Sequence, residues 1–395
     1  MKILQVFDIF SPHTNGTVRV LYQLSKGLML RGHEVTIYTS DFKFDQKYAD
    51  SLKRAIVYPF HLVFSLSALY LTPNIVGEAK RKLKDFDSIH LHCYRSFQNI
   101  VIHHYAKKYG VPYVVDAHGS TPRRVRGKRD HKWLLKWLFD IVFGYRVLRD
   151  ASRVVAQNEV AVREYTEVGV DQNKIALLSL PFDIKKFSHL PPSGQFRQKF
   201  NIREKHIILF LGRIHWIKGL DFLVRSFYEL VQCRSDAILA IVGPDDGYKP
   251  VLIKLINKLG LSERVLFTGF LDGEEKLSAL VDATMLVQPS RYEQASWVPF
   301  EAILCNTPII VSKNTGAGED VSKIDAGYLV EYGNKNELIN TMQEILDDPA
   351  EALNKTRKAR DYIISNLSLE KQAEKYEKLY LSCIEAKQAS NGVRE

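Results

Sequence analysis

Cysteine is scarce in this sequence, and its few copies are far apart. The 395 residues include four cysteines, and no two of them form a CxxC pair. Disulfide frameworks and zinc sites both need cysteines in closer groups, so neither is expected. His90 and His92 share one strand face, but no carboxylate or cysteine completes a metal-ligand spacing around them. The scarcity of cysteine is typical of a reducing compartment, and we expect a cytoplasmic protein.

Long apolar runs are also missing. A membrane span needs about 18 uncharged apolar residues. The nearest stretch, residues 55–76, is interrupted by Pro59, His61 and Pro73. Met1 leads directly into a strand-like run at 3–7, and we predict no signal peptide.

The charge balance narrows the choice of partners. A formal net charge of +10 favours anionic partners: phosphates, nucleic acid or an acidic membrane face. No nucleic-acid recognition motif accompanies the charge, so we expect no nucleic-acid partner.

Runs rich in Val, Ile and Leu alternate with helical patterns along the whole chain. The runs are 3–7, 35–38, 88–92, 113–116, 153–156, 175–178, 207–211, 237–242, 265–268, 284–287, 309–312 and 327–330. Continuous apolar runs predict parallel strands that are buried on both faces. Because 395 residues exceed the size of a single core, we predict two doubly wound α/β domains, 1–185 and 200–365. The stretch 181–201, rich in Pro and polar residues, is the expected linker.

Two cations follow the run 207–211, and ligands of open α/β sheets bind beyond the carboxyl ends of strands. The arginine fork of Arg213 matches phosphate oxygens, and Lys218 adds a point charge. Gly212 allows a close approach of the backbone. Fixed cations here would stabilise the charge that develops on a departing diphosphate. The alternative is a surface loop with two solvated charges.

Two glutamates follow the run 284–287. Pro299 predicts a helix that begins nearby and ends at about Cys305, which places Glu301 in its first turn. Glu293 would then hold a donor sugar and Glu301 a ribose. The backbone N–H groups of the intervening loop would face phosphate or sugar oxygens; these belong to Ala295, Ser296, Trp297 and Val298. The alternative is structural, because the helix dipole stabilises acids at a helix start.

Two further positions follow predicted strands near the amino end. Gly16 is suited to donate its N–H to a phosphate. The sequence around it is not GxGxxG, so a dinucleotide fold is not indicated. His118 is suited to contact a sugar hydroxyl or to shuttle a proton, although a lone loop histidine can also be structural.

Taken in order, these motifs resemble the retaining family 4 glycosyltransferases of GT-B fold. The resemblance covers nearly the whole chain, and the ordered set is more specific than any one member. The matching segments are 30–35 (LRGHEV), 89–92 (IHLH), 118–119 (HG), 212–213 (GR), 218–219 (KG), Gly269, 289–290 (PS), Glu293, 301–302 (EA) and 307–310 (TPII).

The resemblance implies an α/β architecture of two Rossmann-like domains that face a cleft, with the final helix, 368–390, packing back on the first. It implies transfer of a hexosyl group from a UDP- or GDP-sugar to a saccharide or lipid-linked acceptor, with retention of configuration. Gly16, Arg213 and Lys218 would bind phosphates, His118 and Glu293 the sugar, and Glu301 the ribose. Gly269 and Phe270 would line the base. No metal or other cofactor is implied, because the two cations replace it.

Some positions depart from the family pattern. Ala295-Ser296 stands where Phe-Gly is common, and Asn15-Gly16 where Gly-Gly is common, which leaves the donor sugar open. Two other functions also stay open. One is a nucleotide-sugar epimerase of the same architecture, and the other is a non-catalytic sugar- or membrane-binding protein.

A basic loop leads into an aromatic-rich helical pattern after His118. The cations are Arg123, Arg124, Arg126, Lys128 and Arg129, and the aromatic residues include Trp133 and Trp137. This combination suits an anionic membrane surface, so we expect peripheral association with the inner membrane face. The alternative is a core helix with a solvated basic loop.

Overall fold

The computed structural model describes residues 1–12, 16–66, 69–121 and 133–392. They form two compact units. Unit 1 is Met1–Phe182 with Leu367–Glu395, and unit 2 is Asp183–Asn366. Each unit contains a parallel sheet with helices on its faces, so the predicted pair of Rossmann-like α/β domains is confirmed.

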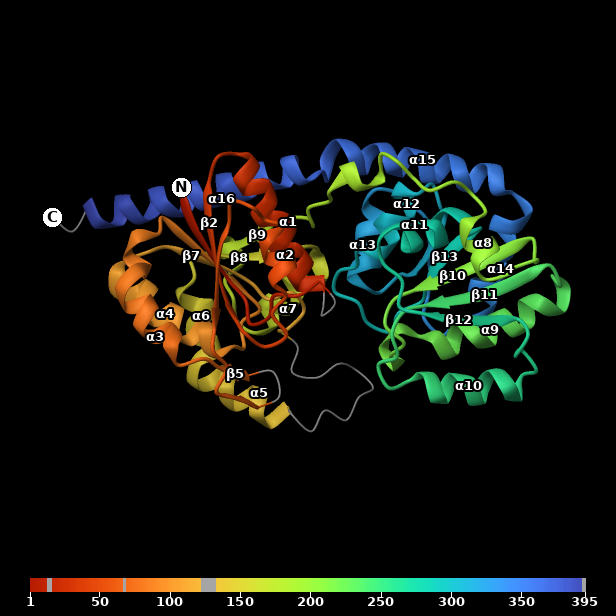
Figure 1. The fold of residues 1–395 in the computed structure, drawn as a ribbon, viewed down its shortest axis with the longest axis horizontal. Coiled ribbons are helices and arrows are strands. Elements are labelled where there is room, and N and C mark those ends of the chain that lie inside the picture. Colours follow the sequence, from red (N-terminus) through yellow and green to blue (C-terminus); the bar gives the residue numbers. More distant parts are fainter. Residues whose placement is uncertain (13–15, 67–68, 122–132, 393–395) are drawn as a thin grey trace. The chain divides into compact units, whose positions relative to one another are not determined.

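The main sheet in the described part of unit 1 has seven parallel strands (Figure 1). In spatial order they are β3 (Ile56–Phe60), β2 (Glu34–Ser40), β1 (Lys2–Val6), β6 (Ser88–His92), β7 (Tyr113–Asp116), β8 (Arg153–Ala156) and β9 (Ile175–Leu177). The strand order reverses between β1 and β6. A reversal of this kind opens a crevice at the carboxyl ends of the two strands.

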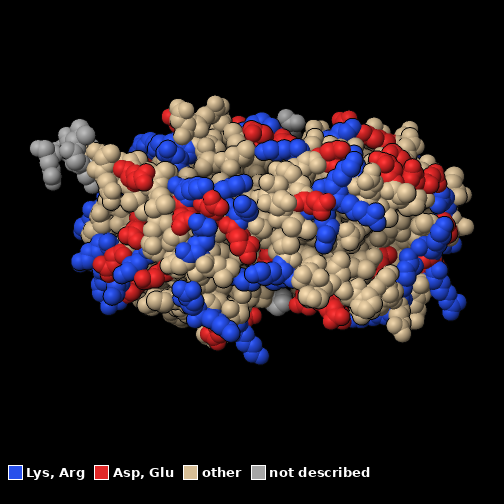
Figure 2. Space-filling model, turned by 90° about the horizontal axis from the view of Figure 1, so that it is seen from above, with Lys and Arg blue, Asp and Glu red and all other residues tan. Residues whose placement is uncertain are grey.

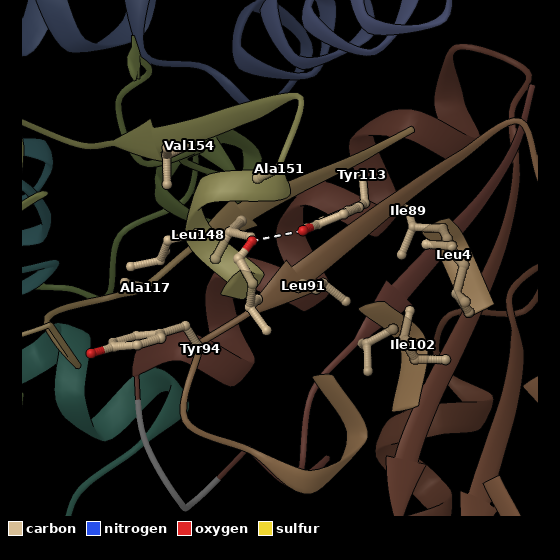
Figure 3. Close-up of a cluster of buried hydrophobic side chains, with 14 of the residues drawn as sticks. Leu4, Ile89, Leu91, Tyr94, Ile102, Tyr113, Ala117, Leu148, Ala151 and Val154 are labelled. Atoms are coloured by element: carbon tan, nitrogen blue, oxygen red, sulfur yellow. Dashed lines mark hydrogen bonds between the residues drawn. The ribbon is translucent and has the colours of Figure 1, made fainter. Parts of the chain in front are cut away.

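Helices cover both faces of this sheet. They are α1 (Gly16–Leu30), α2 (Gln46–Asp50), α3 (Asn74–Lys82), η1 (Leu83–Asp85), α4 (Phe97–Tyr109), α5 (Trp133–Phe139), η2 (Asp140–Gly144), α6 (Tyr145–Asp150), α7 (Glu159–Glu167), η3 (Gln172–Lys174) and α16 (Leu369–Gly392). Figure 3 shows the core on one face, where side chains such as Leu91, Ile102 and Leu148 pack together. The hydroxyl of Tyr113 donates to the carbonyl of Val147 at 2.7 Å, so this large ring is buried without an unmet polar group.

Two strand features were not predicted. Strand β3 lies at the edge of the sheet, where Pro59 is tolerated because the outer side needs no N–H donor. Strands β4 (Phe64–Leu66) and β5 (Leu69–Leu71) form an antiparallel pair.

The sheet in unit 2 has six parallel strands among the described residues: β12 (Val265–Gly269), β11 (Ala237–Val242), β10 (His206–Leu211), β13 (Met285–Gln288), β14 (Ile309–Ser312) and β15 (Tyr328–Val330). Its helices are η4 (Ile184–Phe187), α8 (Gln195–Lys199), η5 (Trp216–Lys218), α9 (Leu220–Cys233), α10 (Lys249–Lys258), α11 (Gly273–Asp282), α12 (Val298–Leu304), α13 (Gly316–Lys323), α14 (Lys335–Asp347) and α15 (Pro349–Asn366). The order reverses between β10 and β13, which marks a second crevice.

Two segments attach to the units through specific contacts. The stretch expected as a linker contains η4 and α8, and Asp282 accepts hydrogen bonds there from the backbone N–H groups of Gly194 and Arg197. Helix α16 packs against α1, where the absent side chain of Gly27 makes room for Ala373.

Candidate active site

Glycines end several strands near the switch point of unit 2, the place between β10 and β13 where the strand order reverses. Gly212, Gly243 and Gly269 stand at the carboxyl ends of the adjacent strands β10, β11 and β12. A Cβ atom built on Gly243 would lie 1.9 Å from the carbonyl oxygen of Gly212, so no other residue fits there. Because glycine has no side chain, the ends of these strands leave space for a ligand to approach the backbone.

Lys218 and Glu293 meet at this switch point. Lys218 ends η5 beyond β10, and Glu293 lies in the loop beyond β13. The Lys218 Nζ atom pairs with Glu293 Oε2, and the two side chains are 13% and 15% exposed. The sequence positions are far apart, and the parallel sheet brings them together.

Backbone contacts fix the two segments that carry this ion pair. The N–H of Arg291 donates to the carbonyl of Ile217 at 2.8 Å. Gly219 has φ +68°, and a Cβ atom there would lie 2.0 Å from the carbonyl oxygen of Pro289. Asp221 and Arg291 add a second ion pair between the same segments. The Lys218–Glu293 pair therefore sits on a rigid support.

Arg213 has a different partner from Lys218. Its guanidinium pairs with Asp246, and its side chain is 57% exposed. The Arg213 side chain is therefore exposed to solvent just beyond the end of β10.

Glu301 is placed as predicted, in the first turn of α12. It is 1% exposed, and Lys276 Nζ lies 2.8 Å from its Oε1 atom. The pKa of Cys305 is raised to about 12, mainly by burial and to a lesser extent by the nearby charge of Glu301, so this thiol stays protonated.

The remaining predicted donor residues lie at the start of α12, in the loop before it, and just after β12. Ser296 and Trp297 are buried, and Ser296 Oγ donates to Gln288 Oε1 at 3.1 Å. Ala295 and Val298 are half-buried. Phe270, directly beyond β12, is 53% exposed.

The point in unit 1 where the strand order reverses holds His118, which was predicted, together with Asp8 and Cys93, which were not. Asp8 follows β1 and is buried, and burial raises its pKa to about 8 although a hydrogen bond from Ser96 lowers it. Cys93 and His118 follow β6 and β7 with φ of +57° and +47°. Non-glycine residues in this conformation are strained and cluster at functional sites.

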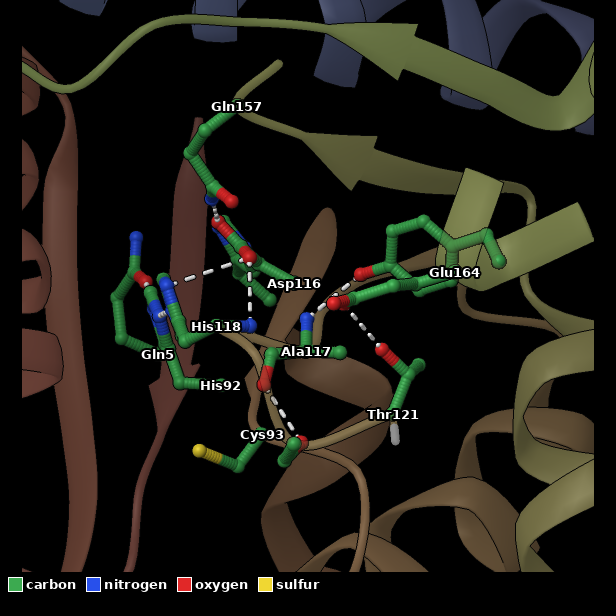
Figure 4. Close-up of polar contacts among 12 residues, drawn as sticks. Gln5, His92, Cys93, Asp116, Ala117, His118, Thr121, Gln157 and Glu164 are labelled. Carbon is green, nitrogen blue, oxygen red and sulfur yellow. Dashed lines mark hydrogen bonds and ion pairs between the residues drawn. The ribbon is translucent and has the colours of Figure 1, made fainter. Parts of the chain in front are cut away.

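His118 lies in a buried polar network (Figure 4). Its Nε2 atom is 2.8 Å from His92 Nδ1, and its Nδ1 atom is 3.2 Å from Asp116 Oδ1. Gln157 Nε2 donates to the other Asp116 oxygen. Burial lowers the pKa of His118 while Asp116 raises it, and burial raises the pKa of Asp116. The rule that ligands bind at strand ends would have singled out Asp8, Cys93 and Asp116.

The structure describes only some of the other residues that were predicted to form a site in unit 1. Gly16 begins α1 and is exposed, but residues 13–15 before it lie outside the described part. The five predicted cations between Arg123 and Arg129 also lie outside it.

Helix α5, which follows those cations, contributes no buried residue, and Trp133 and Trp137 are 39% and 38% exposed. The alternative of a core helix is therefore wrong for α5, but it holds for α6, in which Val147 and Leu148 are buried. Figure 2 shows Lys and Arg interspersed with Asp and Glu over the visible face.

Within the described ranges, no group of three or more His, Cys, Asp or Glu side chains is arranged to hold a metal ion. No helix of those ranges combines the length and the apolar character of a bilayer span.

Comparisons with known families cover most of the chain. Residues 193–364 match the family model described as "Glycosyl transferases group 1". Residues 14–186 match the model described as "Glycosyltransferase Family 4".

Two curated relatives and one solved structure show the range of similarity. A GDP-mannose-dependent α-(1-6)-phosphatidylinositol monomannoside mannosyltransferase of Mycolicibacterium smegmatis is 23% identical over 98% of this chain and 100% of its own. A 2-deoxystreptamine glucosyltransferase of Streptomyces kanamyceticus is 26% identical over 65% of this chain and 67% of its own. The crystal structure of Anabaena HepE in complex with UDP-glucose has a TM-score of 0.78 at 20% identity, covering 97% of this chain and 100% of that one.

Two parallel-sheet Rossmann-like units, together with these structural neighbours, define a glycosyltransferase of GT-B fold. The chain belongs to glycosyltransferase family 4.

Proposed function

We propose that this glycosyltransferase moves a hexosyl group from a UDP- or GDP-sugar to a saccharide or lipid-linked acceptor, with retention of configuration. The observation that carries the proposal is the Lys218–Glu293 ion pair at the switch point of unit 2. It combines a cation for a diphosphate with a carboxylate that accepts hydrogen bonds from sugar hydroxyls. Two relatives support the donor class, since one is named as GDP-mannose-dependent and HepE was solved with UDP-glucose.

We assign the donor site to unit 2. Lys218 and Arg213 stabilise the charge that forms on the departing diphosphate, and Glu293 positions the hexose. Glu301 binds the ribose, and Phe270 lines the base. These two cations stand in for a metal ion, so we expect transfer without an added metal.

We assign the acceptor side to unit 1, where His118 contacts the sugar and Gly16 donates to a phosphate. A retaining reaction on one face of the sugar needs no enzyme nucleophile. The bond from the anomeric carbon to the diphosphate breaks, the acceptor oxygen bonds to that carbon on the same side, and the hydroxyl proton passes to the departing phosphate oxygen. Proton NMR of the first-formed product measures the anomeric configuration, and an inverted product would refute this part of the proposal.

Helix α5 supports an association with an anionic membrane surface. It exposes apolar side chains around its circumference, namely Trp133, Leu134, Leu135, Trp137 and Leu138, each between 38% and 53% exposed. In the sequence, the cations of 123–129 directly precede it. Apolar side chains beside cations suit the boundary between headgroups and acyl chains. The relative that acts on a phosphatidylinositol mannoside agrees with a lipid-linked acceptor.

A thermal-shift panel of UDP-, GDP- and ADP-sugars tests the donor first. The true donor raises the melting temperature, because a ligand that binds only the folded state stabilises it. Product analysis with this donor, in EDTA and with an acceptor panel, follows. A new glycosidic bond supports the proposal. Conversion of the donor without any acceptor would identify an epimerase, and binding without turnover would identify a non-catalytic protein.

A further inference from the structure

Three histidine rings are stacked beneath the carboxyl end of the unit 1 sheet. The rings of His90 and His92 have centroids 4.2 Å apart with an interplanar angle of 18°, and those of His92 and His118 are 5.1 Å apart at 2°. His90 and His92 are fully buried, and the side chain of His118 is 6% exposed. The stack joins the interior of β6 to the loop that follows β7.

Hydrogen bonds assign the protons in this stack. Gln5 Oε1 only accepts, so at 2.6 Å His92 Nε2 must carry a proton. Burial lowers the pKa of His92 well below its usual range, which keeps the ring neutral with a lone pair on Nδ1. The 2.8 Å contact at Nδ1 then requires His118 to donate from its Nε2 atom.

The remaining contact determines the state of His118. With its Nε2 atom committed as a donor, His118 faces Asp116 Oδ1 through Nδ1 at 3.2 Å. These two atoms form an ion pair when the ring is an imidazolium and Asp116 is a carboxylate, and the uncharged alternative is a neutral imidazole beside a carboxylic acid. In both states the pair is neutral overall, and both ring nitrogens of His118 are used inside the protein.

We propose that Gln5 and His92 are positioning residues for His118: they fix its ring plane and the proton on its Nε2 atom, and with Asp116 at Nδ1 both ring nitrogens are directed to partners inside the protein. His118 then meets a substrate through its main chain and ring edge, and it does not act as a general base. The inference rests on the proposed function, in which His118 contacts the sugar. The strained φ of +47° at His118 agrees with a side chain that its surroundings hold in place.

Helix α16 contacts the same stack at its His90 end. Tyr380 of α16 is buried, and its hydroxyl lies 2.8 Å from His90 Nδ1. The ring of Tyr376, one turn earlier, lies 5.8 Å from that of His90. A helix that is nearly 300 residues away in sequence thus closes the buried end of the network.

Two substitutions of His92 separate hydrogen bonding from packing. His92→Asn places an oxygen near the position of Nδ1 and retains an acceptor for His118, but it removes the ring. His92→Phe retains a stacked ring and removes both hydrogen bonds. We expect His92→Phe to lower kcat about tenfold or more, with the donor KM within about threefold, because misplacement of a contacting group affects the transition state most. We expect His92→Asn to retain more activity than His92→Phe. The reverse order would show that packing alone matters and would overturn the proposal.

A spectroscopic test does not depend on turnover. In protein labelled with ¹⁵N-histidine, two-bond ¹H–¹⁵N spectra should show His92 as the neutral Nε2–H tautomer and a proton on His118 Nε2. Gln5→Leu should give mixed tautomers at His92, whereas Gln5→Glu should keep the Nε2–H form. An Nδ1–H tautomer at His92 in the unaltered protein would refute the assignment. If no donor supports transfer, the proposed function fails, while these spectra still decide the proton arrangement.

Discussion

At the scale of single residues, the charge on Glu293 has two opposing effects on donor binding. In the proposed function Glu293 accepts hydrogen bonds from the sugar, while in the structure it pairs with Lys218, the cation that we assign to the diphosphate. We therefore expect Glu293→Gln to lower turnover about tenfold or more. Affinity for UDP or GDP should be unchanged or up to about tenfold tighter, because a part-buried ion pair worth about 1 kcal/mol no longer competes. Steady-state kinetics and calorimetric titration measure the two effects.

A matched control for this change lies in the same unit. Glu337 pairs with Lys313 at the surface, and Glu337→Gln removes an equal charge away from the switch point. It should alter neither turnover nor nucleotide affinity. A large loss of nucleotide affinity in Glu293→Gln alone would assign Glu293 to the diphosphate and contradict its role on the sugar.

At the scale of helices, the contact between α1 and α16 depends on one missing side chain. A Cβ atom on Gly27 would lie 2.8 Å from Ala373 Cβ and 3.1 Å from the carbonyl of Leu369. Gly27→Ala should therefore lower the stability of the protein by about 1–3 kcal/mol, as overpacking does. Gly77, in α3, has no atom within 4 Å of such a Cβ. Gly77→Ala should be neutral or stabilising by up to about 1 kcal/mol, since alanine favours helix. Equal effects in thermal melts would show that α16 is not tightly packed there.

The segment around α5 gives a second prediction at this scale. Changing Arg123, Arg124 and Arg126 to glutamine should weaken sedimentation with anionic vesicles, by about 1 kcal/mol for each cation near the surface. Neutralising Lys80, Arg81 and Lys82, the basic end of α3, removes the same charge elsewhere in unit 1. If both triple variants lose binding equally, the effect is one of net charge and the docking role of this segment is wrong.

At the scale of the whole molecule, buried ionisable groups make the stability of unit 1 depend on pH in both directions. Burial lowers the pKa values of His90 and His92, so the stability gained by keeping these rings neutral is lost as pH falls below about 6.5. Asp8 acts oppositely. Its raised pKa means that its contribution is complete below about pH 4 and is lost as pH rises through about 8.

The loss of stability expected from Asp8 as pH rises can be tested in the full-length protein. Between pH 6.5 and 8, Asp8 should cost about 1–2 kcal/mol of stability, and Asp8→Asn should remove that decline. Asp41→Asn serves as the control, because hydrogen bonds that Asp41 accepts from the His61 ring and the Leu62 N–H lower the pKa of this exposed carboxyl, and it stays ionised throughout the window. Melting temperatures at several pH values decide the matter, and an equally steep decline in Asp8→Asn would show that other groups control it.

The sequence by itself determined the strands, the two-sheet class and the order of the motifs. Continuous Val, Ile and Leu runs have few places to be buried except the middle of a parallel sheet, and residues after those runs must lie at strand ends. Strands such as β6, β7, β8 and β14 match the predicted ranges to the residue. The exposed edge strand β3 escaped prediction because it contains Pro59 and is not buried on both faces.

Only the tertiary structure decided which partners these side chains have. Lys218 meets Glu293 while Arg213 meets Asp246, although all four residues follow strands of one sheet. Likewise, Gln5, His92, His118 and Tyr380 come from four separate segments, and the sheet and α16 bring them into contact. Local patterns record burial and periodicity, whereas hydrogen bonds and ion pairs arise between residues that are distant in sequence. The chemistry of the site therefore follows from strand order and helix packing, which no single stretch of the sequence encodes.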